Sequence, residues 1–311
     1  MRPWVVLFAM LGLLVSMAAC TGEESAGAPS TTFAPVTTTT STILAPTTTA
    51  TSTTSPDDSQ ESDANPFPAG EPVDLVYISD SGGAEVAEKY AALTSEALDR
   101  EVRLHDLRQG GMSITSVPAL VRGSTRVVAD AEIIVLYAHP GGLEYDLPEP
   151  NILTCFQALD VFDDDYAGPE WTPGTKWEPT PVVPEVEDWQ PYRDVLDEVY
   201  GEIWEARDGR PVVLRAHDIY NGFIAPWREL GIEPECTANW EVEMQVIREA
   251  AEANGAVFVS FFDAFNGSGH DEDPREKGWM QDDGMHANEE GGAVAAEALI
   301  GVGFELSEPP Q

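Results

Sequence analysis

From about residue 72 onward, short apolar runs alternate with segments of helical periodicity. The apolar runs predict five strands, over residues 73–78, 102–107, 133–137, 211–215 and 257–262. Amphipathic helices are predicted over residues 86–97, 117–128, 192–203, 242–251 and 289–300. Strands that alternate with helices imply parallel βαβ crossovers, and therefore a sheet covered by helices on both faces. The predicted fold class is α/β, with one core of ample size.

The first 20 residues have the pattern of an export signal. Arg2 supplies a positive start, residues 4–14 form an apolar run, and Ala18 and Ala19 precede Cys20. The apolar run is too short to span a bilayer stably. Ala-Ala-Cys resembles the lipobox of bacterial lipoproteins, which implies that Cys20 is acylated and becomes the mature N-terminus. An ordinary cleaved signal, which would give a soluble secreted protein, is the alternative.

Residues 21–70 differ in composition from the segments before and after them. They are rich in Thr, Ser, Pro and Ala and contain hardly any large apolar residue. Such a segment buries too little surface to offset its ordering entropy, so we expect a disordered linker. The expected organisation is a signal peptide over 1–20, this linker, and a globular domain over 71–311 on the outer face of the cell membrane.

The charge of the chain excludes one class of partner. It has 55 acidic and 16 basic residues, a net charge of −39. Nucleic acids need Lys and Arg to neutralise phosphates, so no nucleic-acid partner is expected. Anionic lipid head groups are disfavoured for the same reason, which leaves the lipid anchor as the only contact with a membrane. We interpret the charge as a solubility or salt adaptation of a monomer.

The cysteines predict a disulfide. If Cys20 is acylated, Cys155 and Cys236 remain as an even pair in an oxidising compartment. Their spacing fits no metal site, and we expect neither a metal nor a cofactor. The bridge would join the insert after the third strand to the segment after the fourth, and we hypothesise that it fixes the walls of a substrate site. The insert contains Trp171, Trp177 and Trp189, which either line a cleft or pack the insert onto the core.

Two segments at opposite ends of the predicted domain contain residues suited to nucleophilic catalysis. Ser81 stands between the first strand and the first helix and is followed by two glycines, which permit a sharp turn and close approach of a substrate. Serine needs a base within hydrogen-bond reach and a group that orients this base. Asp283 lies three residues before His286, just ahead of the last helix, and can hold the imidazole in the required tautomer. As an alternative, Ser81 or Asp80 simply caps the following helix.

These two segments resemble conserved blocks of the SGNH/GDSL hydrolases. Ile78-Ser79-Asp80-Ser81-Gly82 is similar to the first block, and Asp283-Gly284-Met285-His286-Ala287-Asn288 to the last. Asn266-Gly267, after the fifth strand, is a further similarity. The resemblance covers about residues 72–299. It implies a flavodoxin-like three-layer α/β/α sandwich with a five-stranded parallel sheet, and a serine hydrolase that forms an acyl-enzyme on Ser81.

The same resemblance implies an oxyanion hole built from the Ser81 backbone N–H, a glycine after the second strand and an asparagine after the third. Gly111, or alternatively Gly110, fits the second position. The third departs from the family: His139 stands where the asparagine is usual, and a neutral imidazole N–H can replace that donor. Ser79 replaces the usual glycine before Asp80. His217 and Asp218 are adjacent on a strand and therefore point apart, so we interpret them as pocket or structural residues rather than a catalytic pair.

The function predicted from these residues is extracellular ester hydrolysis, by a carboxylesterase, a lipase-like enzyme or a carbohydrate deacetylase. The substrate would be an ester of a small molecule or of a polysaccharide. Two alternatives remain open at this point. An acyltransferase of the same fold would use an acceptor hydroxyl in place of water, and a non-catalytic surface-binding lipoprotein would retain the fold without the chemistry.

Overall fold

The computed structural model describes residues 67, 70–141, 143, 147, 151–159 and 181–311. Within them, five strands form one parallel sheet in the order β2-β1-β3-β4-β5. The strands are β1 (Val73–Ile78), β2 (Val102–Asp106), β3 (Ile133–Leu136), β4 (Val213–His217) and β5 (Val257–Val259). The predicted α/β class and the five-stranded parallel sheet are confirmed.

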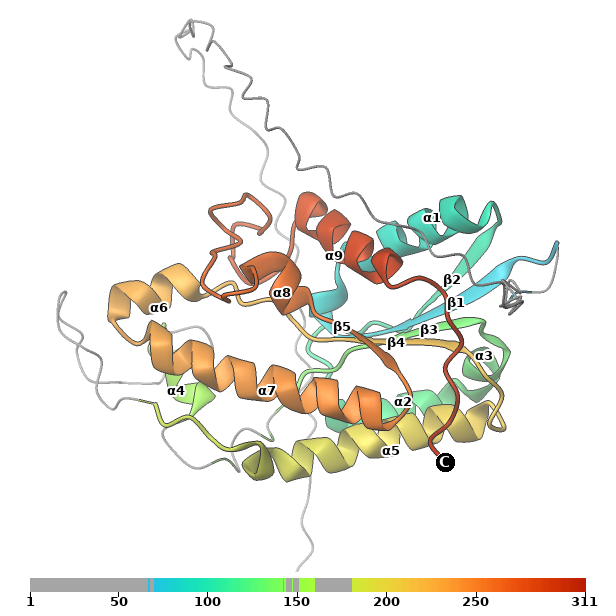
Figure 1. Cartoon of the computed structure of the whole chain (residues 1–311), viewed down its shortest axis with the longest axis horizontal. Helices are drawn as coiled ribbons and strands as arrows, with labels where there is room; N and C mark the ends of the chain where they lie inside the picture. The colour runs from blue at the N-terminus through green and yellow to red at the C-terminus, as the bar shows by residue number, and fades with distance from the viewer. Residues whose placement is uncertain (1–66, 68–69, 142, 144–146, 148–150, 160–180) are drawn as a thin grey trace, which may run out of the picture. The chain divides into compact units, whose positions relative to one another are not determined.

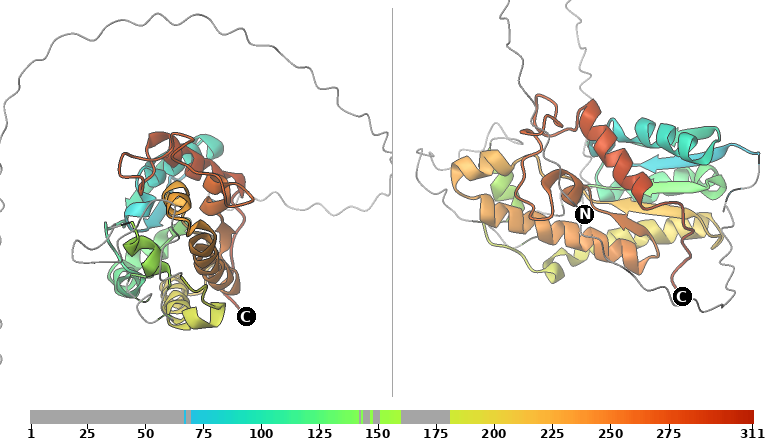
Figure 2. Two further views of the ribbon diagram at one scale, coloured as in Figure 1. Left: turned by 90° about the vertical axis from the view of Figure 1, so that its left-hand side faces the viewer. Right: turned by 45° about the horizontal axis from the view of Figure 1, so that its top comes forward.

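Helices cover both faces of the sheet, as Figure 1 shows. On one face α1 (Val86–Leu98) packs against α9 (Glu289–Gly301), beside α8 (Phe261–Asn266). The other face carries α2 (Val117–Gly123), α3 (Thr125–Asp130), α5 (Gln190–Ala206) and α7 (Glu233–Ala253). Figure 2 shows the same layers from two other directions. The domain is therefore a three-layer α/β/α sandwich.

The sheet is the centre of the hydrophobic core because parallel strands are buried on both faces. Every residue of β3 and β4 is buried, as are five of the six residues of β1. β2 lies at one edge and is only partly buried, with the polar side chains of Arg103 and His105 among its residues. The central strands β1, β3 and β4 thus provide a rigid base for the loops at their carboxyl ends.

The structure corrects several of the predicted boundaries. The apolar run 257–262 is not one strand: β5 ends at Val259, and the Ser260 hydroxyl caps α8 by accepting a hydrogen bond from the Asp263 N–H. The predicted helix over 117–128 is divided into α2 and α3. Two short helices were not predicted, α4 (Ile152–Gln157) and α6 (Ile224–Leu230).

The predicted disulfide is present between Cys155 and Cys236 and joins α4 to α7. Trp189 is buried and packs against Tyr192 at the start of α5, so it belongs to the core. Trp171, Trp177, the export signal with Cys20, and most of the linker lie outside the described residues. Among the helices that the structure does describe, none is both long and apolar enough to cross a membrane.

Candidate active site

Ser81 opens a short 3-10 turn, Ser81–Gly83, directly after β1. The Asp80 carboxylate caps this turn and accepts a hydrogen bond of 2.7 Å from the Gly82 N–H, while the Gly83 N–H donates to the Asp80 carbonyl. Glycine is required at position 83, since a Cβ atom there would lie 2.6 Å from Ser79 Oγ. The Ser81 N–H has no acceptor in the described part of the chain, so it remains available to a ligand.

His286 and Asp283 lie in a loop just before α9, and the two side chains are paired. Asp283 Oδ2 is 2.7 Å from His286 Nδ1, and Asp283 Oδ1 accepts the backbone N–H groups of Met285 and His286. Because a carboxylate accepts, Nδ1 carries the proton and Nε2 of the neutral ring has a free lone pair. This is the tautomer that a general base requires.

Contacts from other elements hold this loop in place. The Ala287 N–H donates to the Tyr220 hydroxyl at 2.6 Å, and the Gln281 N–H donates to the His286 carbonyl at 2.8 Å. Asn288, the N-cap of α9, accepts from two N–H groups of the first turn of that helix. The imidazole is therefore fixed through its backbone on both sides as well as through Asp283.

Ser81 and His286 line one cavity of about 90 Å³, to which His139 also contributes. Its remaining walls are mainly apolar and aromatic: Tyr137, Phe156, Ile219, Tyr220, Phe223, Trp240 and Met285. No hydrogen bond joins Ser81 Oγ to His286 within the described residues. Catalytic hydrogen bonds are often long in ligand-free structures and shorten only when substrate is bound.

Asp80 lines the same cavity as Ser81, His139 and His286. Burial raises the pKa of the Asp80 carboxyl, while the hydrogen bond from the Gly82 N–H and the two nearby histidines act in the opposite direction. Segments after β1, after β3 and before α9 therefore converge on one place.

His139 has the tautomer that suits an oxyanion donor. Its Nδ1 accepts a hydrogen bond of 2.9 Å from the Gly141 N–H, so the proton of a neutral ring is on Nε2. Gly141 has φ +56° and its position leaves no room for a side chain, because a Cβ would lie 2.7 Å from the Ser113 Cα. Of the two glycines after β2, Gly110 lines a hollow together with Ser81, and Gly111 lines neither of the two hollows at Ser81.

Removing the His139 side chain tests this role. We expect His139→Ala to lower kcat by on the order of 10²–10³-fold, because the loss of one oxyanion donor typically has an effect of that size. KM should change little, since such a donor stabilises the transition state and not the bound substrate. His139→Gln retains an N–H donor and should recover part of the loss. If both variants keep the wild-type kcat, His139 is only part of the cavity wall.

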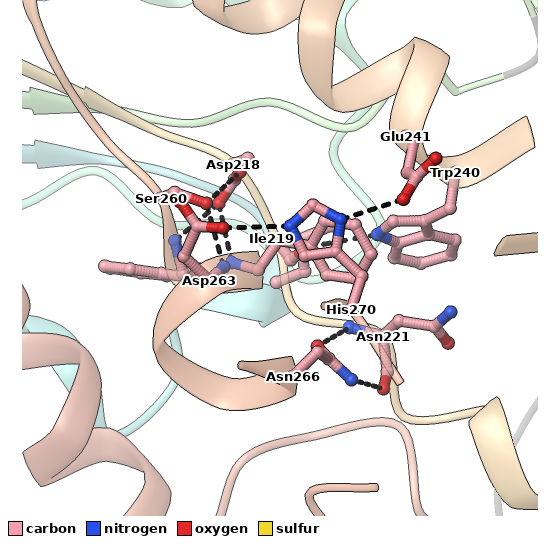
Figure 3. Close-up of polar contacts among 11 residues, drawn as sticks. Asp218, Ile219, Asn221, Trp240, Glu241, Ser260, Asp263, Asn266 and His270 are labelled. Atoms are coloured by element: carbon pink, nitrogen blue, oxygen red, sulfur yellow. Dashed lines mark hydrogen bonds and ion pairs between the residues drawn. The ribbon is translucent and has the colours of Figure 1, made fainter. Parts of the chain in front are cut away.

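His217 and Asp218 are fully buried and structural. The His217 ring stacks on Phe261 with centroids 4.0 Å apart, and its Nε2 lies 2.9 Å from the Tyr77 hydroxyl. Burial lowers the pKa of His217 to about 3, so the ring is neutral. Asp218 accepts hydrogen bonds from the Ser260 hydroxyl and from the first two N–H groups of α8, which Figure 3 shows. No hydrogen bond joins the two side chains within the described residues: His217 contacts Tyr77 and Phe261, and Asp218, the first residue after β4, contacts Ser260 and the start of α8.

Asp218 predicts a specific pH dependence of stability. Burial raises its pKa to about 7, against the effect of its three hydrogen bonds, so between about pH 4 and 7 the folded state binds a proton that the unfolded state has lost. This proton stabilises the fold by up to about 1.4 kcal/mol per pH unit as pH falls through that window. We expect the isosteric Asp218→Asn variant to lack this increase in unfolding free energy at lower pH, because the amide does not titrate.

The measurement is urea unfolding of both proteins at pH 4.5 and pH 6.5. The difference in unfolding free energy, variant minus wild type, should become more negative at pH 4.5. A difference that is independent of pH would mean that Asp218 keeps an ordinary carboxyl pKa in the folded state.

Figure 3 also shows a polar network that sequence reasoning missed. His270 lies between two carboxylates, 2.9 Å from Glu241 on α7 and 2.9 Å from Asp263 on α8. Asn266 accepts from the Asn221 N–H and donates back to the Asn221 carbonyl. These contacts join α7, α8 and the loop after β4. The loop and α7 carry Tyr220 and Trp240, which line the cavity at Ser81, so the network stabilises that part of its wall. The Asn266-Gly267 similarity therefore marks a structural asparagine.

The disulfide lies next to the cavity. Phe156 follows Cys155 directly, and Trp240 lies one helical turn after Cys236 on α7. The two aromatic rings contact each other edge to face, with centroids 5.9 Å apart, and both line the cavity. The bridge thus connects the two segments that carry these walls.

We expect the double variant Cys155→Ala with Cys236→Ala to lose about 4 kcal/mol of unfolding free energy, since the bridge closes a long loop with a sequence separation of 81 residues. If the bridge also holds the walls, the variant should discriminate less between short and long acyl esters at a temperature where it stays folded. An unchanged ratio of kcat/KM values would restrict the bridge to a stabilising role.

Over residues 70–141 and 181–311 and the short described segments between them, no group of three His, Cys, Asp or Glu side chains is arranged to hold a metal ion.

Comparison with known proteins gives structural matches alone. No protein-family model matches the chain, and no curated protein matches it. Among solved structures, a lipase from a goat rumen metagenome is similar, with a TM-score of 0.52 and 14% identity over 75% of this chain and 98% of that one. An α/β hydrolase enzyme from the metagenome of Lake Arreo, Spain, has a TM-score of 0.47 and 20% identity over 76% and 96% of the two chains. At 14% identity, the similarity to the rumen lipase supports the fold alone.

Proposed function

We propose that the protein is a serine ester hydrolase in which Ser81 is the nucleophile, His286 the base and Asp283 the residue that orients it. The observation that carries the proposal is the tautomer of His286: its Nδ1 is bound by Asp283, and its ring lines the same cavity as Ser81. An ordinary surface histidine would not be expected both to contact a carboxylate and to line a cavity together with a serine. The lipase among the similar structures is consistent with this chemistry.

In the proposed reaction, Ser81 Oγ attacks the ester carbonyl carbon and its proton passes to His286 Nε2. The bond from the carbonyl carbon to the alcohol oxygen then breaks, and His286 returns the proton to that oxygen. Water attacks the acyl-enzyme, gives a proton to His286, and the Ser81 oxygen leaves and is reprotonated. The Ser81 N–H, the His139 Nε2–H and a Gly110 or Gly111 N–H would stabilise the negative carbonyl oxygen.

Labelling with a fluorophosphonate probe tests the proposal. Wild-type protein should be labelled covalently on Ser81, as located by mass spectrometry of the peptides, and Ser81→Ala should not be labelled. Turnover of p-nitrophenyl acetate in water distinguishes a hydrolase from an acyltransferase, which needs an added acceptor alcohol. A folded wild-type protein that neither reacts nor turns over would support a non-catalytic binding protein instead.

We also propose that the domain is displayed outside the cell on a lipid anchor at Cys20. Two observations support export: the signal-like first 20 residues, and the Cys155–Cys236 disulfide, which is typical of oxidising compartments. In a bacterial host, Cys20→Ser should move the protein from the membrane fraction to the medium. Wild-type protein found only in the medium would indicate an ordinary cleaved signal.

A further inference from the structure

Two hollows of different chemistry meet at Ser81. One is the apolar cavity of about 90 Å³ described above. The other is an open hollow of about 640 Å³ on the side of α1 and β2, and Asp80 and Ser81 line both. The larger hollow has a volume in the range usual for small-molecule sites. An ester bond placed at Ser81 therefore has room for two unlike groups.

The larger hollow is polar and rich in carboxylates. Its walls come from the Ser81 turn, from α1 and from the segment that ends β2: Glu85, Glu88, Lys89, Ala92, Asp106, Arg108 and Gly110, in addition to Asp80, Ser81 and Ala84. Four carboxyl groups thus face two cations. Burying an apolar group there would remove water from these charges without replacing its hydrogen bonds, which is costly.

Both cations of the hollow already have anionic partners. Arg108 contacts Glu88 at 2.5 Å and Asp106 at 2.8 Å, and it also donates to the Gly83 carbonyl. Lys89 lies 3.4 Å from Glu289 on α9. An anionic ligand would have to compete with these carboxylates and would meet an excess of negative charge. Hydroxyl groups, in contrast, can donate hydrogen bonds to the carboxylate oxygens without electrostatic repulsion.

The smaller cavity sets a limit on the other half of the substrate. This cavity measures about 90 Å³, less than the roughly 150 Å³ of an enclosed cavity that binds benzene. Its aromatic and aliphatic walls favour an apolar group, and its small volume favours a short one.

We propose that the substrate is an ester between a short acyl chain, which enters the apolar cavity, and a polyhydroxylated, non-anionic alcohol, which occupies the open hollow beside α1. This inference rests on the hydrolase function proposed above. Water and the ester would give a short carboxylic acid and the free polyol. The two ester oxygens would stay beside Ser81, within reach of His286 and the oxyanion donors, while the remainder of each group extends into its own hollow.

The first part of the test uses substrate series on the folded wild-type protein. We expect kcat/KM for p-nitrophenyl acetate to exceed that for p-nitrophenyl octanoate by more than about tenfold, since each methylene that a pocket cannot accept has a large cost. An acetylated neutral sugar should be a better substrate than an acetylated uronic acid by a similar factor. Preference for octanoate, or for the uronic acid ester, would overturn the assignment.

The second part uses variants that change one hollow at a time. Ala92→Trp places a large side chain in the polar hollow and should lower kcat/KM for the sugar ester several-fold more than for ethyl acetate. Ala97→Trp is the matched control, since Ala97 lies exposed on the same helix and lines neither hollow. Ile219→Ala, or Ile219→Val if the first is unstable, should enlarge the cavity and improve turnover of butyrate and hexanoate relative to acetate.

The outcomes separate this inference from the function on which it rests. If Ser81 is labelled by a fluorophosphonate but Ala92→Trp behaves like Ala97→Trp, the polar hollow is not the alcohol site although the protein is a hydrolase. If Ile219→Ala alters alcohol selectivity and not acyl selectivity, the two groups lie the other way round. Absence of labelling and of turnover would overturn both proposals together.

Discussion

Replacement of Ser81 or His286 by alanine is expected to lower kcat for ester hydrolysis by on the order of 10⁶-fold, and the double variant should lose no more than either single one. Members of a catalytic triad act as a unit, so removal of the nucleophile or of its base abolishes the same step. The measurement is kcat for p-nitrophenyl acetate in the three variants, with active-site titration to exclude wild-type contamination.

Ser81→Ala should change the fold little, so a difference in kcat between this variant and wild type can be attributed to the missing hydroxyl. Ser81 is only partly buried, and the turn is capped by Asp80 rather than by the Ser81 hydroxyl. Equal thermal midpoints for wild type and Ser81→Ala would show that the loss is chemical. If instead the effects of Ser81→Ala and His286→Ala multiply in the double variant, the two residues act in separate steps and the proposed mechanism is wrong.

The predictable parts of this fold are those with a local signal. Strand β1 and helix α1 follow from an apolar run and an amphipathic stripe, and the turn between them from Gly82 and Gly83. The rule that parallel strands present their carboxyl ends at one edge predicts that Ser81 and His139 come close together. Asp283 and His286 are three residues apart in one loop, so their contact is local as well.

The errors arise where a distant residue decides the local structure. Phe261 and Phe262 continue an apolar run, yet they begin α8, because the Asp218 carboxylate accepts both of their N–H groups; Asp218 directly follows β4, more than 40 residues earlier. The Tyr220 hydroxyl, which holds the loop of His286 at Ala287, is likewise 67 residues away in sequence. Periodicity carries no information on such contacts, so they could not have been predicted.

The tautomers of the two site histidines show how local and distant information combine. The sequence shows His139 where the resemblance implies an asparagine, but it does not show which ring nitrogen carries the proton. The Gly141 N–H, two residues later, settles which ring nitrogen carries the proton, and the β-bridge between Ser113 and His139 fixes the backbone. Gly141 has φ +56°, a backbone angle that glycine adopts readily but that the sequence alone does not show.

Asp283→Asn is expected to lower kcat by about 10⁴-fold while leaving the fold and KM nearly unchanged. The amide is isosteric with the carboxylate, but it can present an N–H to His286 Nδ1, and the imidazole then has its proton on Nε2, where it cannot act as a base. Hydrogen bonds to both Asp283 oxygens give the amide little freedom to avoid this arrangement. Asp282→Asn, one residue earlier in the same exposed loop, is the matched control and should retain activity.

The pH dependence of the same carboxylate gives this prediction a second readout. Partial burial acts to raise the pKa of Asp283, but the hydrogen bonds from the His286 side chain and from the N–H groups of His286 and Met285 outweigh it and hold the pKa below its usual value. The stabilising contact with His286 is therefore fully present above pH 4 and is lost only as the pH falls through that lowered pKa. In an NMR titration, the Asp283 carboxyl should titrate below an ordinary aspartate in wild type and closer to an ordinary value in His286→Ala, where the two backbone N–H groups remain as the only donors of the three. An ordinary value in both proteins would show that the pair does not form in solution, and the orienting role of Asp283 would have to be abandoned.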